Sequence, residues 1–197
     1  EANIGVEAVA RGTARLDEQR VTAETKQRND FPSVRGARYV TRGKWYYECT
    51  VYSECAQIGW AAREFTGNIG RGEGVGDDEL SWAYDGLRCR KWHKAWSKYG
   101  VKWSDGNVVG CALDLDARRM SFSLNGVDLG VAYRDFAVPA GGVCAAASFD
   151  KKLVFNLGHR AFRHAPSGGY APLVERDAML RVELDAFKRV VHLLRRR

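Results

Sequence analysis

Short segments in which apolar and polar residues alternate, separated by turn sequences, constrain the fold of this chain most strongly. Residues 109–115 alternate in this way, and so do residues 120–124. Asn125-Gly126 follows, a pair that favours a type I′ hairpin turn because both of its positions require positive φ. A period of two places successive side chains on opposite faces of a strand. The stretch therefore predicts consecutive antiparallel strands with one buried face.

The same signals predict further strands, and no helical pattern interrupts them before residue 173. In residues 44–52 the alternation predicts a core face that includes Tyr47 and Cys49 and an opposite, polar face that includes Glu48. Other expected strands are residues 57–61, 80–84, 87–92, 143–149 and 153–157. Residues 62–79 and 93–107 are expected to form two long loops. Many short strands joined by turns predict an all-β fold, a sandwich of two antiparallel sheets.

The C-terminal segment has a different pattern. Apolar residues recur there every three or four positions, which predicts an amphipathic helix over residues 174–197. Pro172 precedes the segment, and the arginines at its end suit the negative pole of a helix dipole. We expect residues 1–173 to form one domain. The helix can dock on that domain, self-associate or begin a following domain, and we favour the last two together.

The composition agrees with a folded domain. Of 197 residues, 45% are hydrophobic and 11% aromatic, which is enough for a core. No apolar run is long enough for a membrane span, and no secretory signal pattern is present. The five cysteines are odd in number and lack zinc spacings, so we expect reduced thiols, no metal, no cofactor and a cytoplasmic location. The chain begins at Glu1, and we expect it to be part of a longer protein.

The net charge of +7 raises the question of a nucleic-acid partner. Part of the excess positive charge lies in residues 195–197 and part in residues 88–102, a stretch that contains no Asp or Glu. No motif for binding RNA or DNA accompanies either cluster. We therefore expect a solvated basic face or a surface for an acidic protein partner, and we expect neither a nucleic-acid nor a membrane partner.

The sequence offers no catalytic arrangement that we recognise. The glycine-rich residues 70–76 lack the sequence and context of a phosphate-binding loop, and we interpret them as a flexible recognition loop. Asp77, Asp78 and Glu79 are adjacent in the chain and so cannot face one another as paired carboxylates. The four histidines are scattered and lack a nucleophile motif. We expect a protein that is not an enzyme.

Several blocks of the sequence, in order, resemble those of a known family. They are residues 43–48 (GKWYYE), 57–60 (QIGW), 74–77 (GVGD), 81–86 (SWAYDG), 105–110 (DGNVVG), 113–115 (LDL), 122–126 (FSLNG) and 155–158 (FNLG). Together they resemble the SPRY domain, and the chain is most similar to the SPRY domains of RING-finger ubiquitin ligases. The resemblance implies a concanavalin-like sandwich that binds a protein or peptide through loops at one edge. Any ligase activity would lie in a RING domain outside this chain.

The resemblance also implies a place for the binding surface. In relatives that bind peptides, an aromatic residue after the strand of small residues helps to form the pocket, and Phe149 occupies that position. The two long loops are expected to border the same surface. The candidate partner-binding residues are Arg63, Asn68, Arg71, Asp77, Trp96, Lys98, Tyr99, Phe149 and Asp150.

We expect these residues to recruit a substrate or partner, an acidic one in particular, to an intracellular ubiquitin ligase. Two alternatives remain open at this point: a carbohydrate-binding, lectin-like sandwich and a scaffold that assembles through its C-terminal helix. The ligand, its motif and the oligomeric state do not follow from the sequence.

Overall fold

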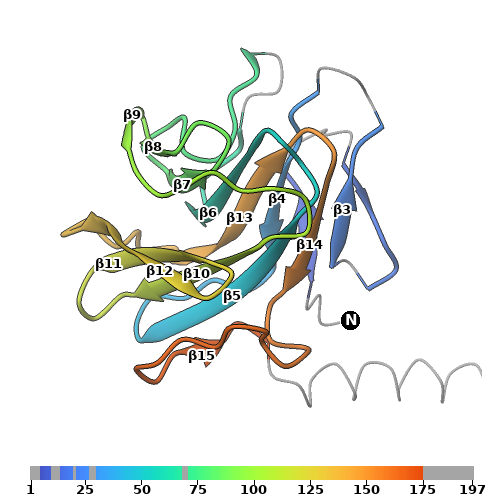
Figure 1. Cartoon of the computed structure of the whole chain (residues 1–197). Coiled ribbons are helices and arrows are strands. Elements are labelled where there is room, and N and C mark those ends of the chain that lie inside the picture. The colour runs from blue at the N-terminus through green and yellow to red at the C-terminus, as the bar shows by residue number, and fades with distance from the viewer. Residues whose placement is uncertain (1–4, 10–13, 20, 27–29, 68–70, 175–197) are drawn as a thin grey trace, which may run out of the picture.

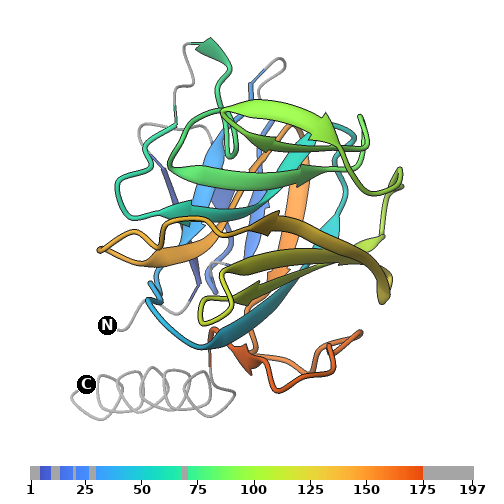
Figure 2. The same cartoon turned by 90° about the vertical axis from the view of Figure 1, so that its left-hand side faces the viewer.

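A computed structural model describes residues 5–9, 14–19, 21–26, 30–67 and 71–174 of the chain. Within these ranges the chain forms two β-sheets that pack face to face (Figures 1 and 2). The predicted antiparallel β-sandwich is therefore confirmed. The predicted helix over residues 174–197 lies outside the described residues except for Val174, so it stays a prediction.

The first sheet contains β1 (Val6–Ala8), β4 (Ser33–Gly36), β13 (Val143–Phe149), β6 (Ala56–Ala62), β7 (Ser81–Asp85), β8 (Arg90–His93) and β9 (Ala95–Lys98), in this spatial order. The second contains β12 (Val127–Arg134), β11 (Arg119–Leu124), β10 (Val108–Asp114), β5 (Lys44–Val51), β14 (Lys152–Asn156), β3 (Thr22–Glu24) and β2 (Arg15–Leu16). The short β15 (Ala171–Pro172) pairs with β5 in parallel, whereas the other pairs are antiparallel.

The core lies between the two sheets and follows the alternation of the strands. The largest side chains in it that are fully buried include Trp60, Tyr47, Phe122 and Phe155. The turn predicted after residue 124 is present, since Asn125 and Gly126 have φ values of 49° and 82°. The core face predicted for residues 44–52 is also confirmed at Tyr47 and Cys49, which have no exposed area.

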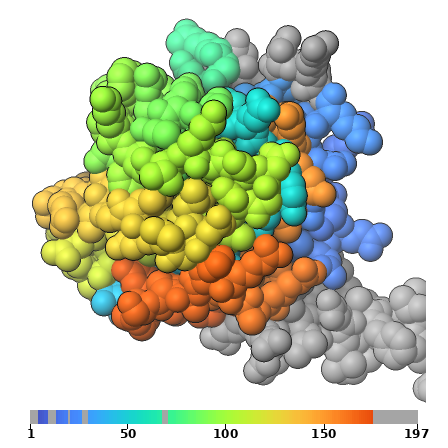
Figure 3. Space-filling model, viewed as in Figure 1, coloured from blue at the N-terminus to red at the C-terminus, as the bar shows by residue number. Residues whose placement is uncertain are grey.

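The opposite face of β5 is buried as well, which corrects the expectation that it is a polar outer face. Glu48 is only 2% exposed, and its carboxylate accepts hydrogen bonds from the backbone amides of Arg163 (2.9 Å) and His164 (2.6 Å). Tyr46 packs edge-on against Phe162, with ring centroids 4.9 Å apart. The segment after β14, orange to red in Figure 3, thus covers this face of the second sheet. A carboxylate can be buried here because backbone donors replace its water.

The second predicted loop, residues 93–107, is wrong in part. His93 ends β8, and residues 95–98 form β9, which pairs with β8 in a tight hairpin around Lys94. All four residues of β9 are exposed, so no buried face marked this strand in the sequence. The first predicted loop, residues 62–79, is confirmed except for Ala62, which ends β6; the described residues from 63 to 79 contain no strand.

Candidate functional site

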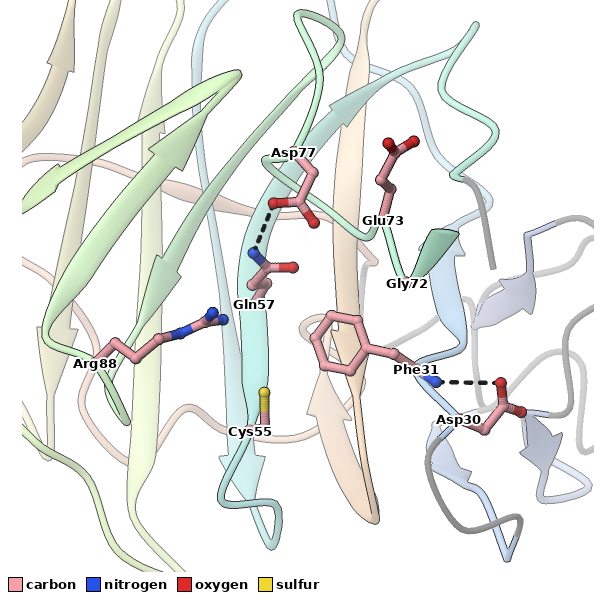
Figure 4. A pocket seen from close by; sticks show the side chains of 8 residues that line it. All are labelled: Asp30, Phe31, Cys55, Gln57, Gly72, Glu73, Asp77 and Arg88. Carbon is pink, nitrogen blue, oxygen red and sulfur yellow. Dashed lines mark hydrogen bonds between the residues drawn. The ribbon is translucent and has the colours of Figure 1, made fainter. Parts of the chain in front are cut away.

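An open cleft lies on the outer face of the first sheet, where residues from four separate parts of the chain meet (Figure 4). Its volume is about 560 Å³. The residues that line it are Asp30, Phe31, Cys55, Gln57, Gly72, Glu73, Asp77 and Arg88. We call this feature the cleft.

Ser148 of β13 holds two sides of the cleft together. Its hydroxyl lies 2.7 Å from the hydroxyl of Ser33 and accepts a hydrogen bond of 2.9 Å from the backbone amide of Val75. These bonds join the chain beside Phe31 to the loop that carries Gly74. A Cβ atom at Gly74 would lie 2.5 Å from the Ser148 hydroxyl oxygen, so only glycine allows this close approach. Local packing in the sheet therefore fixes the position of the loop.

Gln57 and Asp77 form the polar centre of the cleft. The Gln57 side-chain amide donates to Asp77 (3.1 Å), and the backbone amide of Gly74 donates to the other Asp77 oxygen (2.7 Å). Gln57 is only 2% exposed, yet its side-chain oxygen has no hydrogen-bond partner among the described residues. Figure 4 shows this oxygen on the side of Gln57 that faces Phe31. A buried acceptor without a donor costs about 1–3 kcal/mol.

Burial raises the pKa of Asp77, although bonds from Gly74 and Gln57 and the charge of Arg88 partly oppose the rise. The folded chain therefore takes up this proton at a higher pH than the unfolded chain does. The associated stability is fully present below the unfolded-state pKa of Asp77 and is lost as the pH rises through its folded-state pKa.

Asp77→Asn is expected to abolish this contribution. As the pH is lowered from about 7 to about 4, the free energy of unfolding of the wild type should rise relative to that of the variant. Urea denaturation of both chains across this range measures the difference. A difference that stays constant with pH would contradict the assignment of a raised pKa to Asp77.

Arg88 supplies the cationic side of the cleft and is held by a buried carboxylate. Asp85 is fully buried, and its carboxylate accepts hydrogen bonds from the Arg88 guanidinium, from the Trp92 indole (3.3 Å) and from the backbone amides of Leu87 (3.0 Å) and Arg88 (3.1 Å). The guanidinium also lies over the Trp92 ring, 4.6 Å from its centroid. These contacts restrict the orientation of Arg88 before any ligand binds.

Cys55 is the thiol that lines the cleft. Burial raises its pKa, and the charge of Arg88 only partly offsets this effect. The thiol is therefore protonated at neutral pH, the form that is a poor nucleophile.

Among the residues that the structure describes, no group of three or more His, Cys, Asp or Glu side chains could hold a metal ion.

Two of the predicted partner-binding residues are not placed as expected. Phe149 has no exposed area and packs in the core between the sheets, so it cannot form the floor of the cleft; Ser148, on the outer face, lies beneath the cleft instead. Tyr99 packs against Tyr84 and Phe122, and its hydroxyl donates to the Gly130 carbonyl oxygen (2.7 Å). Its hydroxyl is therefore used within the domain.

The other predicted residues are divided between separate places. Asp77 lines the cleft, exposed Arg71 is adjacent to Gly72, which also lines it, and the Asp150 carboxylate accepts a hydrogen bond from the backbone amide of Cys55 (3.4 Å). Arg63 lies elsewhere, with its guanidinium 4.0 Å from the Tyr39 ring centroid. Trp96 and Lys98 belong to β9. Asn68 lies outside the described residues. Whether any of them binds a partner stays a prediction.

The two segments expected to border one surface do meet. The backbone amide of Lys94, between β8 and β9, donates to the carbonyl oxygen of Gly76 (2.9 Å). Of the eight lining residues of the cleft, only Asp77 is among the candidate partner-binding residues; the seven that sequence reasoning missed are Asp30, Phe31, Cys55, Gln57, Gly72, Glu73 and Arg88. Gly72 and Glu73 lie in the glycine-rich stretch interpreted as a recognition loop, whereas nothing in the local sequence marks the others, because strand pairing brings them together from distant positions.

An antiparallel sandwich of two sheets, with a loop-lined cleft on one of them, defines the class, a β-sandwich domain. The chain belongs to the SPRY domain family, whose sequence model matches residues 44–160. SPRY domains commonly serve as protein-interaction modules. The predicted resemblance to this family is confirmed.

Two relatives show where this domain occurs. Over 152 residues, 74% of the chain, it is 37% identical to the E3 ubiquitin-protein ligase RKP of Arabidopsis thaliana. Over 151 residues, 73% of the chain, it is 28% identical to the ATP-dependent RNA helicase Ddx1 of Drosophila melanogaster. The matched stretches make up 12% and 20% of these relatives, so the chain spans only a small part of their length. No helix of the described residues is long and apolar enough to cross a membrane.

Proposed function

We propose that this domain recognises a segment of a partner protein in the cleft and recruits that partner to a ubiquitin ligase. The observation that carries the proposal is the buried Gln57 oxygen, which lacks a donor and lies beside an open cleft. Clefts that combine an apolar surface with a few fixed polar groups are typical binding sites. Phe31 supplies the apolar surface, and Gln57, Asp77 and Arg88 supply the fixed polar groups.

The charges in the cleft define the chemistry of the segment that it would bind. Three carboxylates, of Asp30, Glu73 and Asp77, line the cleft together with a single cation, Arg88, whose charge Asp85 already compensates. A side chain that donates hydrogen bonds, such as asparagine, glutamine or lysine, fits this lining better than a carboxylate does. The expected preference for an acidic partner therefore does not apply to the cleft.

The setting in a ubiquitin ligase rests on the relative RKP, which is named as an E3 ubiquitin-protein ligase. The other relative is named as an RNA helicase, and these two proteins share the domain while differing in activity. A module that accompanies different activities fits recognition better than catalysis. The domain is thus proposed to be non-catalytic.

The five free cysteines support a reducing, cytoplasmic location.

Display of a peptide library against the whole chain tests the proposal. A shared motif should be selected, and Phe31→Ser or Glu73→Lys should weaken the best peptide at least about tenfold, because each removes a feature of the cleft lining. Glu64→Lys is the control for the charge change, since exposed Glu64 follows the opposite end of β6 from Gln57. Fluorescence anisotropy measures the affinities.

Each other outcome has a defined meaning. If a motif is selected but its affinity is unchanged by both cleft substitutions, binding occurs elsewhere on the domain. Stabilisation against heat by a sugar, with no peptide selected, would support the lectin-like alternative. If neither peptides nor sugars bind, the proposal fails, and assembly through the C-terminal segment becomes the function to test.

A further inference from the structure

The first sheet ends in a strand with a free edge. β9 is the last strand in the order of that sheet and pairs only with β8 among the described strands (Figure 1). The amide of Tyr99 donates to the carbonyl oxygen of Cys89 (3.0 Å), so these two residues form a hydrogen-bonded pair of the hairpin. Hydrogen-bonded and non-hydrogen-bonded pairs alternate along an antiparallel ladder. The backbone N–H and C=O groups of Trp96 and Lys98 therefore point away from β8, toward the edge.

Basic and aromatic side chains lie next to this edge. Arg90 pairs with Lys98 and Trp92 with Trp96 across the hairpin, so these four side chains share the outer face of the sheet. The Arg90 guanidinium lies 3.6 Å from the centroid of the Trp96 ring, and Trp96 is 51% exposed. Within the described residues neither Arg90 nor Lys98 forms an ion pair, whereas Arg88 and Lys94 each do. Two cations beside the edge thus remain available to a partner.

We propose that β9 is a second interaction surface, at which an extended acidic segment of a partner protein adds a strand to the first sheet. Its backbone would bond to the outward groups of Trp96 and Lys98. Its acidic side chains on the outer face would contact Arg90 and Lys98. Addition of a strand to an exposed sheet edge is a common mode of peptide recognition. This surface is distinct from the cleft and takes ligands of opposite charge.

Two other occupants fit the edge less well. A second copy of this chain, paired edge to edge through β9, would bring Arg90 and Lys98 close to the same cations of the other copy, and like charges repel. Single-stranded nucleic acid also combines with basic and aromatic surfaces. However, its backbone has no evenly spaced amide donors and acceptors to match those of Trp96 and Lys98. The free edge therefore favours a polypeptide.

A fluorescent peptide of alternating glutamate and threonine provides the probe, with the whole chain as the receptor. We expect binding that weakens as salt increases. The double substitution Arg90→Gln with Lys98→Gln should reduce the affinity at least about tenfold, because it removes both cations. Lys102→Gln, which replaces an exposed lysine outside the hairpin, should leave the affinity unchanged.

The backbone contribution is tested with two N-methylated forms of the probe. One carries methyl groups on the threonine amides and the other on the glutamate amides. Since only every second amide of an added strand faces β9, one form should lose binding and the other should retain it. Equal binding by both forms, or by a peptide with its glutamates in one block, would overturn strand addition.

Three further results would also overturn the proposal. The first is that the alternating peptide does not bind. The second is that the double substitution of Arg90 and Lys98 leaves its affinity unchanged. The third is that single-stranded oligouridylate binds more tightly than the peptide does. The last would identify a nucleic-acid surface instead. Circular dichroism of each variant checks that the sandwich is intact.

Discussion

Asp85→Ala is expected to lower the free energy of unfolding by about 3–5 kcal/mol, because it removes the acceptor of a buried, charged network. The carboxylate has no exposed area and accepts from two backbone amides, from the Trp92 indole and from the Arg88 guanidinium. Alanine would leave these donors without a partner at the end of β7. The substitution should also weaken peptide binding in the cleft, since Arg88 would lose the group that orients it.

Urea denaturation followed by tryptophan fluorescence measures the first effect. Asp128→Ala is the matched control, because exposed Asp128 accepts a single local hydrogen bond from the amide of Gly130 (2.9 Å). That substitution should cost no more than about 1 kcal/mol. If both substitutions cost the same, the buried network around Asp85 contributes no special stability.

Gly59→Ala is expected to destabilise the domain by at least about 3 kcal/mol or to prevent folding. Gly59 lies in β6, between β13 and β7, and pairs with Ala83. A Cβ atom at this position would lie 2.0 Å from the carbonyl oxygen of Trp82. The obstacle is backbone, so relief requires a shift of β7. That shift would also disturb the cleft, because Asp85 ends the same strand.

Gly36→Ala provides the comparison within the same sheet. A Cβ atom at Gly36 would make its nearest contact, with the Cβ atom of Ala145, at 3.6 Å, an ordinary van der Waals distance. Its stability should change by less than about 1 kcal/mol. The thermal midpoints of the two variants give the result. A Gly59→Ala protein as stable as the Gly36→Ala protein would show that β7 moves without cost.

The parts of the fold that the sequence predicts well are those where one face of a strand meets the core and the other meets water. The hairpin around Asn125-Gly126 is such a case, because alternation and turn chemistry agree. Alternation also indicates the position of Phe149, which lies at a spacing of two from Ala147 and Ala145 in the buried set. Followed strictly, that spacing assigns Phe149 to the core. The resemblance to peptide-binding relatives instead assigns it to a binding pocket.

The features that escaped prediction depend on contacts between distant segments. The burial of Glu48 depends on backbone amides of Arg163 and His164, in a stretch without a periodic apolar pattern. The cleft likewise depends on β13 lying between β4 and β6, which places Ser148 beside Ser33 and Gln57. No local pattern in a single sequence specifies these neighbours.

The covering of β5 by the segment after β14 bears on how this domain can be divided. The family match ends at residue 160, before the amides of Arg163 and His164 that bind Glu48, and it begins at residue 44, after β4. A fragment cut at those limits would lack the strand that borders β13 and would expose Tyr46 together with an unpaired carboxylate. Limited proteolysis should therefore spare residues 160–172, although they contain hardly any regular secondary structure. Recombinant fragments meant for binding assays should extend from β1 through β15.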